Sequence, residues 1–124
     1  MHRLVLVLLL SLSVVAAEDE IVIGTSAAFQ GPSKGLGIEL YRGAAAYFAH
    51  VNAQGGVNHH RIAVRACDDG YNPIPCIRNT VGLVERDDAL LLFGYVGTPT
   101  VTRVLPLLKK YDDRGVLLFF PFTG

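Results

Sequence analysis

The residues best suited to hold a ligand lie in one short loop, Gly94-Tyr95-Val96-Gly97-Thr98-Pro99-Thr100. Thr98 can cap a helix that has Pro99 in its first turn, and the free N–H groups and positive dipole end of such a helix attract an anion such as a carboxylate. Gly97 lets a ligand approach the backbone closely, because it has no side chain. Helix capping alone would also explain Thr98, so from the loop by itself both roles stay open.

A second candidate segment, Phe122-Thr123-Gly124, follows the next apolar run of the chain. A glycine-rich segment at 31–37 comes earlier, but its order differs from that of the phosphate-binding motifs. Lys34 precedes the last glycines, whereas the lysine of a P-loop follows them, and Leu40 stands where a dinucleotide-binding motif has its third glycine. We therefore expect no nucleotide cofactor.

The acidic residues and histidines do not form a recognisable metal site or catalytic site. Asp68 and Asp69 do not converge on a metal or a substrate, because neighbours on an extended strand point to opposite faces, and solvation with turn formation explains them more simply. His50, His59 and His60 lack the spacing of metal ligands. No nucleophile with a nearby base is recognisable either. The sequence thus predicts no metal site, no cofactor, no catalytic residues and no enzymatic activity.

The elements that must position these residues follow from the hydrophobic pattern. Short apolar, β-branched runs predict strands, and longer periodic segments predict helices. The predicted strands are 21–26, 62–66, 90–93 and 116–120, and the predicted helices are 36–53, 74–86 and 100–111. Strands that alternate with helices form a parallel sheet covered on both faces. The predicted fold class is therefore α/β, a three-layer α/β/α open parallel sheet.

In such a sheet, ligands bind in a crevice at the carboxyl ends of the strands. The four loops that leave these ends are 27–37, 68–73, 95–99 and 121–124. We expect them at one edge, with His59 and His60 at the opposite edge. Because the loop around Thr98 lies at the crevice, its position favours ligand binding over capping alone.

The start of the chain predicts a cleaved secretory signal peptide over residues 1–17. His2 and Arg3 precede an uncharged run, 4–15, and Val15-Ala16-Ala17 supplies small residues for cleavage. The run is shorter than the ~20 apolar residues that cross a bilayer as a helix. No cysteine lies near the cleavage point, so no lipid anchor is expected. Residues 18–124 would form the exported domain.

Charge and cysteines narrow the partners and the compartment. The chain has 11 basic and 11 acidic residues and no basic patch, which argues against nucleic acid as a partner. Cys67 and Cys76 could pair in an oxidising compartment, or both could be buried free thiols. We favour the thiols slightly, because the Cys67 side chain can point away from the helix that carries Cys76.

Several of these motifs occur in an order and spacing that resembles the periplasmic substrate-binding proteins of ABC transporters, specifically the leucine/isoleucine/valine-binding type. The segments that carry the resemblance are 21–24, Gly31-Pro32, 51–58, 68–73, 93–100 and 120–124. The resemblance implies a longer, two-lobed periplasmic protein that closes on an amino acid or similar small carboxylate and delivers it to a membrane permease. This chain would be the incomplete first lobe. A ligand-sensing receptor or regulator with the same lobe is the alternative.

The resemblance also implies roles for individual residues. The hydroxyl and backbone N–H of Thr98 would bind the ligand carboxylate, with Val96 and Gly97 lining the pocket. Phe122 falls where a backbone carbonyl receives the ligand amino group. A threonine is expected at Gly124, and Thr123 lies one residue earlier. Further positions that the resemblance singles out are Leu36, at an aromatic lid position, Tyr71, at a cysteine position, and His59, at a common glycine position.

Overall fold

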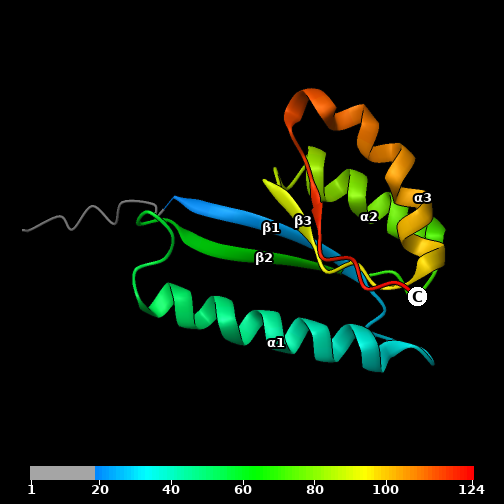
Figure 1. The fold of residues 1–124 in the computed structure, drawn as a ribbon, viewed down its shortest axis with the longest axis horizontal. Coiled ribbons are helices and arrows are strands. Elements are labelled where there is room, and N and C mark those ends of the chain that lie inside the picture. The colour runs from blue at the N-terminus through cyan, green and yellow to red at the C-terminus, as the bar shows by residue number, and fades with distance from the viewer. Residues whose placement is uncertain (1–18) are drawn as a thin grey trace, which may run out of the picture.

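The computed structural model describes residues 19–124, so the predicted signal peptide lies outside the described residues. Strands and helices alternate along this part of the chain, which confirms the predicted order (Figure 1). The elements are β1 (Glu20–Ala27), α1 (Lys34–Ala53), β2 (Arg61–Asp68), α2 (Pro73–Glu85), β3 (Leu91–Phe93), α3 (Thr98–Leu108), the 3₁₀ helix η1 (Lys109–Arg114) and β4 (Leu118–Phe119). None of the described helices combines the length and apolar character that a membrane span needs.

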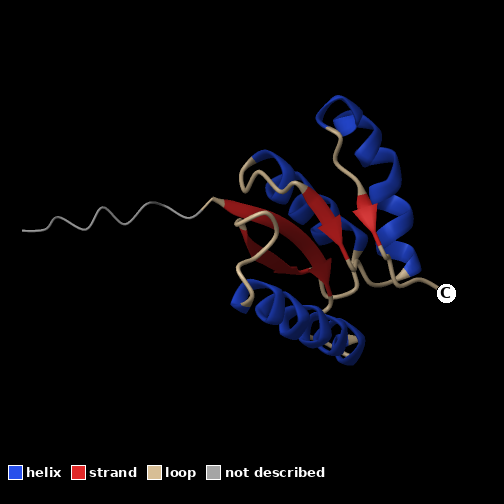
Figure 2. Ribbon diagram, turned by 60° about the vertical axis from the view of Figure 1, so that its left-hand side comes forward, coloured by secondary structure: helices blue, strands red, loops and turns tan. Residues whose placement is uncertain are grey.

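The four strands form one parallel sheet in the spatial order β2-β1-β3-β4. β1 pairs with β2 along its whole length, from Glu20 opposite Arg61 to Ala27 opposite Asp68. Helix α1 covers one face of the sheet, and α2 and α3 cover the other (Figure 1). Figure 2 shows the same layering from a second direction. The predicted three-layer α/β/α architecture is therefore confirmed.

The main core lies between the sheet and helices α2 and α3. Leu83, Leu92, Tyr95 and Val104 are fully buried there. The Tyr95 hydroxyl is satisfied by a 2.9 Å hydrogen bond with the Thr80 hydroxyl, and burial raises the pKa of Tyr95. Apolar burial on this side anchors β3 and α3, which flank the loop around Thr98.

Helix α1 makes close contacts at both of its ends. Near its start, Gly37 packs so closely on the preceding loop that a Cβ would collide with the carbonyl oxygen of Ala28. Near its end, the Asn52 amide bonds both backbone groups of Ile62, donating over 2.9 Å and accepting over 2.8 Å. These contacts fix the position of α1 along the direction of β1 and β2.

The third helix and the fourth strand differ from the sequence prediction. The helix begins at Thr98 rather than at position 100, and it changes to 3₁₀ geometry after Leu108. Pro106, which has no N–H to donate, lies just before that change. β4 comprises only Leu118 and Phe119, because Phe120 leaves the extended conformation with φ of 51°.

Both cysteines are free thiols, so of the two predicted alternatives the structure has the thiols. Cys76 is fully buried on α2, and burial raises its pKa to about 12. Cys67 is half-buried on β2, and burial raises its pKa as well. Both thiols therefore stay protonated near neutral pH and are poor nucleophiles.

Candidate functional site

The candidate site lies at the carboxyl ends of the strands, as predicted. There the ligand loop, residues 94–98, leads from β3 into α3, and residues 120–124 follow β4 alongside it (Figure 1). Val96 and Phe122 form a parallel bridge beyond the ends of the two strands. The Phe122 N–H donates to the Tyr95 carbonyl over 2.8 Å, and the Gly97 N–H donates to the Phe122 carbonyl over 2.9 Å. The structure thus brings the two predicted segments together.

Thr98 lies where these segments meet. Its hydroxyl oxygen accepts a 3.2 Å hydrogen bond from the Gly124 N–H, and it lies 3.5 Å from the Gly124 carbonyl oxygen. The side chain is exposed at the start of α3. As the first residue of the helix, Thr98 has a backbone N–H with no acceptor within the helix. Thr98 therefore offers two polar groups at the positive end of a helix dipole.

The capping role predicted for Thr98 is wrong. Gly97 is the N-cap residue of α3, with φ of 110°, and no side chain makes a capping hydrogen bond. The buried Thr100 hydroxyl instead closes the turn, because it lies 2.8 Å from the carbonyls of both Val96 and Gly97. The Thr98 hydroxyl consequently takes no part in capping α3 and faces Gly124 instead.

The role of Thr100 is not predicted from the sequence. A sequence signal for it exists, because a threonine in the first turn of a helix commonly bonds a carbonyl three or four residues earlier.

Two predicted site residues differ in exposure. The Val96 side chain is buried in the core, so only its backbone faces the site, whereas Thr123 is exposed.

Leu36 and Phe122 come together at an apolar depression between the start of α1 and the chain after β4. The depression has a volume of about 470 Å³ and is lined by Gly35, Leu36, Glu39, Leu40 and Phe122. Leu36 and Phe122 are both half exposed, at 50% and 55%. The predicted residues from the two ends of the chain thus share one apolar surface beside the ligand loop.

The acidic pair Asp68 and Asp69, where β2 ends, forms the predicted turn, but Asp69 is not solvated as predicted. Asp69 is only 3% exposed, so solvation does not explain it. Its carboxylate accepts hydrogen bonds from the Ser26 hydroxyl over 2.8 Å and from the Tyr71 N–H over 2.9 Å. Burial raises the pKa of Asp69 in spite of these bonds. Asp68 does form the predicted turn, accepting from the N–H of Gly70 over 3.1 Å.

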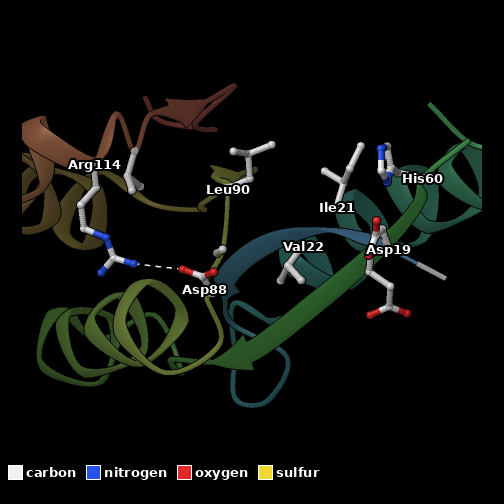
Figure 3. Close-up of a pocket in the computed structure, with 10 residues that line it drawn as sticks. Asp19, Ile21, Val22, His60, Asp88, Leu90 and Arg114 are labelled. Carbon is white, nitrogen blue, oxygen red and sulfur yellow. Dashed lines mark hydrogen bonds and ion pairs between the residues drawn. The ribbon is translucent and has the colours of Figure 1, made fainter. Parts of the chain in front are cut away.

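Another hollow, of about 480 Å³, lies at the opposite edge of the sheet (Figure 3). Arg114 and Asp88 form an ion pair of 3.0 Å at one side of it, and His60 and Asp19 lie at the other. His60 is therefore remote from the ligand loop, as predicted. Within residues 19–124, no group of three or more His, Cys, Asp or Glu side chains is placed to hold a metal ion.

Known proteins with similar sequences are amino acid binding proteins. An amino acid binding protein of Pseudomonas aeruginosa is 27% identical over 102 residues, which cover 82% of this chain and 26% of that protein. A Leu/Ile/Val/Thr-binding protein of Salmonella typhimurium is 27% identical over 112 residues, which cover 90% of this chain and 30% of that protein. The chain thus spans less than a third of the length of either relative.

The solved structures agree with the sequences. The crystal structure of a substrate-binding periplasmic protein from Ralstonia solanacearum shares the fold with a TM-score of 0.76 and 26% identity, over 82% of this chain and 29% of that one. A sequence profile described as periplasmic binding protein matches residues 20–124. The chain therefore belongs to the periplasmic binding protein family, a family of solute-binding proteins rather than enzymes.

Proposed function

We propose that this chain is the first part of the ligand-binding lobe of an extracytoplasmic solute receptor. The receptor binds an amino acid or a similar small carboxylate and delivers it to the membrane permease of an ABC transporter. The observation that carries the proposal is the junction of Thr98 with residues 122–124 at the carboxyl edge of the sheet. Two relatives are named as amino acid binding and Leu/Ile/Val/Thr-binding proteins, which supports an amino acid as the ligand.

The carboxylate of the ligand binds at Thr98. Because the Gly124 N–H already donates to the Thr98 oxygen, the hydroxyl proton is left to donate to a ligand. The contact from Thr98 to the Gly124 carbonyl, at 3.5 Å, is long for a hydrogen bond and easily exchanged. The Thr98 N–H and the dipole of α3 add to the attraction for a negative charge.

The amino group of the ligand binds at the Phe122 carbonyl. This oxygen accepts one hydrogen bond, from the Gly97 N–H, and a carbonyl oxygen has a second lone pair for another donor. Thr123 and Gly124, which follow, border the same position. The carboxylate and the amino group of an amino acid are thereby held by the segments that follow β3 and β4, which are neighbouring strands. The register between Val96 and Phe122 sets the distance between the two binding positions.

The side chain of the ligand lies in the apolar depression at Leu36 and Phe122. Binding pockets for small molecules are typically ~300–1,000 Å³ and mostly apolar, and this depression fits that range at about 470 Å³. Its lining is mainly aliphatic and aromatic carbon, so it favours an aliphatic or aromatic side chain. Leucine, isoleucine and valine are the first candidates.

Export through residues 1–17 places this receptor in the periplasm, with residues 18–124 in the ligand-binding lobe. This location agrees with the family name and with a transport role. Delivery then requires a permease partner at the membrane.

The proposal is tested by titrating leucine, isoleucine and valine into the isotope-labelled chain and following backbone amides by NMR. We expect the amide signals of Gly97, Thr98 and Gly124 to shift. Thr98→Ala should weaken binding by about tenfold or more, because a hydrogen bond to a charged group contributes about 1.5–3 kcal/mol. Thr98→Ser keeps the hydroxyl and should retain most of the affinity.

Thr102→Ala is the matched control. Thr102 lies on the same helix, but its hydroxyl donates to the Thr98 carbonyl over 2.8 Å, within the helix. It should leave the affinity unchanged. Amide shifts that avoid the ligand loop, or equal losses in Thr98→Ala and Thr102→Ala, would reject the assignment of Thr98.

A further inference from the structure

The loop after β2 reaches across the carboxyl edge and touches the ligand loop. The contact is between the ring of Tyr71 and the backbone of Gly97. A Cβ placed on Gly97 would lie 2.5 Å from Cε2 and 2.8 Å from Cζ of that ring. Real Cβ atoms do not approach other atoms so closely, so the ring would have to move aside for any larger residue at 97.

Tyr71 is itself held in an unusual conformation. Its φ is 65°, in the left-handed region that bulky residues seldom adopt. Its N–H donates to the buried carboxylate of Asp69 over 2.9 Å, and the Ser26 hydroxyl on β1 holds the other oxygen of that carboxylate over 2.8 Å. The Asn79 amide of α2 donates in turn to the Ser26 hydroxyl over 3.1 Å.

The next residue of the loop is tied down as well. The Asn72 N–H donates to the Asp69 carbonyl over 2.9 Å, and the Asn72 side chain caps α2 by accepting from the Ile74 N–H over 3.0 Å. The Tyr71 backbone is therefore held between a buried hydrogen-bonded carboxylate and a capped helix. The ring, by contrast, is half-buried and meets the ligand loop at the rim of the core.

We propose that Tyr71 is a positioning residue for the ligand loop. Its ring presses on Gly97 and keeps that residue at φ of 110°, which aims the start of α3 and the polar groups of Thr98. Tyr71 then sets ligand affinity through Gly97. The effect on affinity rests on the proposed function, whereas the effect on the loop does not.

The contact can be separated from the backbone requirement of Gly97. A positive φ makes alanine unfavourable at 97 whatever residue stands at 71, whereas the collision with the ring exists only while the ring is there. A double-mutant cycle isolates the second effect. Tyr71→Asn suits the cycle, because asparagine removes the ring and tolerates the left-handed conformation.

The test compares wild type, Gly97→Ala, Tyr71→Asn and the double variant in the full chain. Hydrogen exchange at the Gly97 amide reports on its bond to the Phe122 carbonyl without any ligand. We expect Tyr71→Asn to speed this exchange at least tenfold and to leave the amides in the middle of α1 unchanged. Tyr71→Phe keeps the ring and should exchange like wild type.

Leucine affinity, measured by the NMR titration, gives the second readout. Gly97→Ala should weaken binding more than tenfold in wild type but only a few-fold in Tyr71→Asn, because the collision has gone. Equal effects of Gly97→Ala in both backgrounds, or unchanged Gly97 exchange in Tyr71→Asn, would overturn the positioning role. If Tyr71→Asn speeds Gly97 exchange and none of leucine, isoleucine and valine binds wild type, the positioning contact stands and the proposed ligand assignment fails. If Tyr71→Asn unfolds the chain, Tyr71→Leu replaces it in the same cycle.

Discussion

At the scale of single residues, the Asp69 carboxylate near the candidate site combines burial with hydrogen bonding. Its carboxylate is buried and accepts bonds from Ser26 and Tyr71, yet burial dominates and raises its pKa above the ordinary 3.8. The neighbouring charge of Asp68 adds to the increase. A raised pKa in the folded state means that folding favours the protonated acid.

This shift predicts how Asp69 affects stability with pH. Its contribution to stability is fully present below about pH 3.8 and is lost as the pH rises through the raised pKa. Asp69→Asn has no such loss, so its stability relative to wild type should rise between acidic and neutral pH. Urea unfolding of both proteins across this range measures the difference.

The control for the loss of one negative charge is Asp113→Asn, at an exposed position before β4. The stability gain of Asp69→Asn between acidic and neutral pH should exceed that of Asp113→Asn. An Asp69→Asn difference that falls toward neutral pH would contradict the assignment of a raised pKa.

At the scale of elements, the packing of α1 depends on the absence of a Cβ atom at one glycine. Gly37 lies against the backbone of the loop after β1, whereas Gly43, on the same helix, is exposed, and open space surrounds the position that a methyl group would take there. A side chain is therefore excluded at Gly37 but accommodated at Gly43. Gly37 permits a close approach of backbone to helix, and Gly43 only weakens the helix through its own flexibility.

Alanine substitutions at these two glycines should therefore have opposite signs. Gly37→Ala should destabilise the chain by about 1–3 kcal/mol or more, because the colliding atom belongs to the backbone and cannot rotate away. Gly43→Ala should stabilise it by about 0.5–1 kcal/mol. Thermal or urea unfolding of the pair decides, and two changes of the same sign would show that α1 is not packed as described.

The elements themselves were largely predictable from sequence, because apolar period and length distinguish buried strands from amphipathic helices. The contacts between elements were not. Thr98 looked like a cap because threonine is common there, but Thr100 closes the turn from inside the core. The burial of Asp69 depends on Ser26, which is 43 residues earlier in the chain. Local patterns carry no information about such distant partners.

At the scale of the whole molecule, the sheet is covered unevenly. Helix α1 lies over β1 and β2 (Figure 1). Beside it, successive ring contacts join Phe48, Phe93, Phe120 and Phe119 into an aromatic patch. Phe120 is 74% exposed and Phe119 is 40% exposed. Contiguous exposed apolar surface next to a short edge strand favours association with other chains.

We therefore expect this chain to self-associate as its concentration rises, and Phe120→Asn to reduce the association. Asparagine removes the exposed ring and also suits the positive φ at this position, so folding should not suffer. Sedimentation equilibrium over a range of concentrations measures both proteins. Ile74→Asn, which removes an apolar residue of 60% exposure from α2 on the other face, is the control and should associate like wild type.

The strand order has a consequence for the proposed ligand preference. From β1, the chain passes to β2 on one side and then to β3 on the other, so the helices that follow β1 and β3 leave toward opposite faces. Their separation opens the crevice at this topological switch point whatever side chains surround it. The position of the crevice thus follows from the chain path, while the residues proposed to contact the ligand, such as Leu36 and Thr98, lie in the first turns of the helices beside it. Substitution there can alter specificity without disturbing the buried core, which lies beneath α2 and α3.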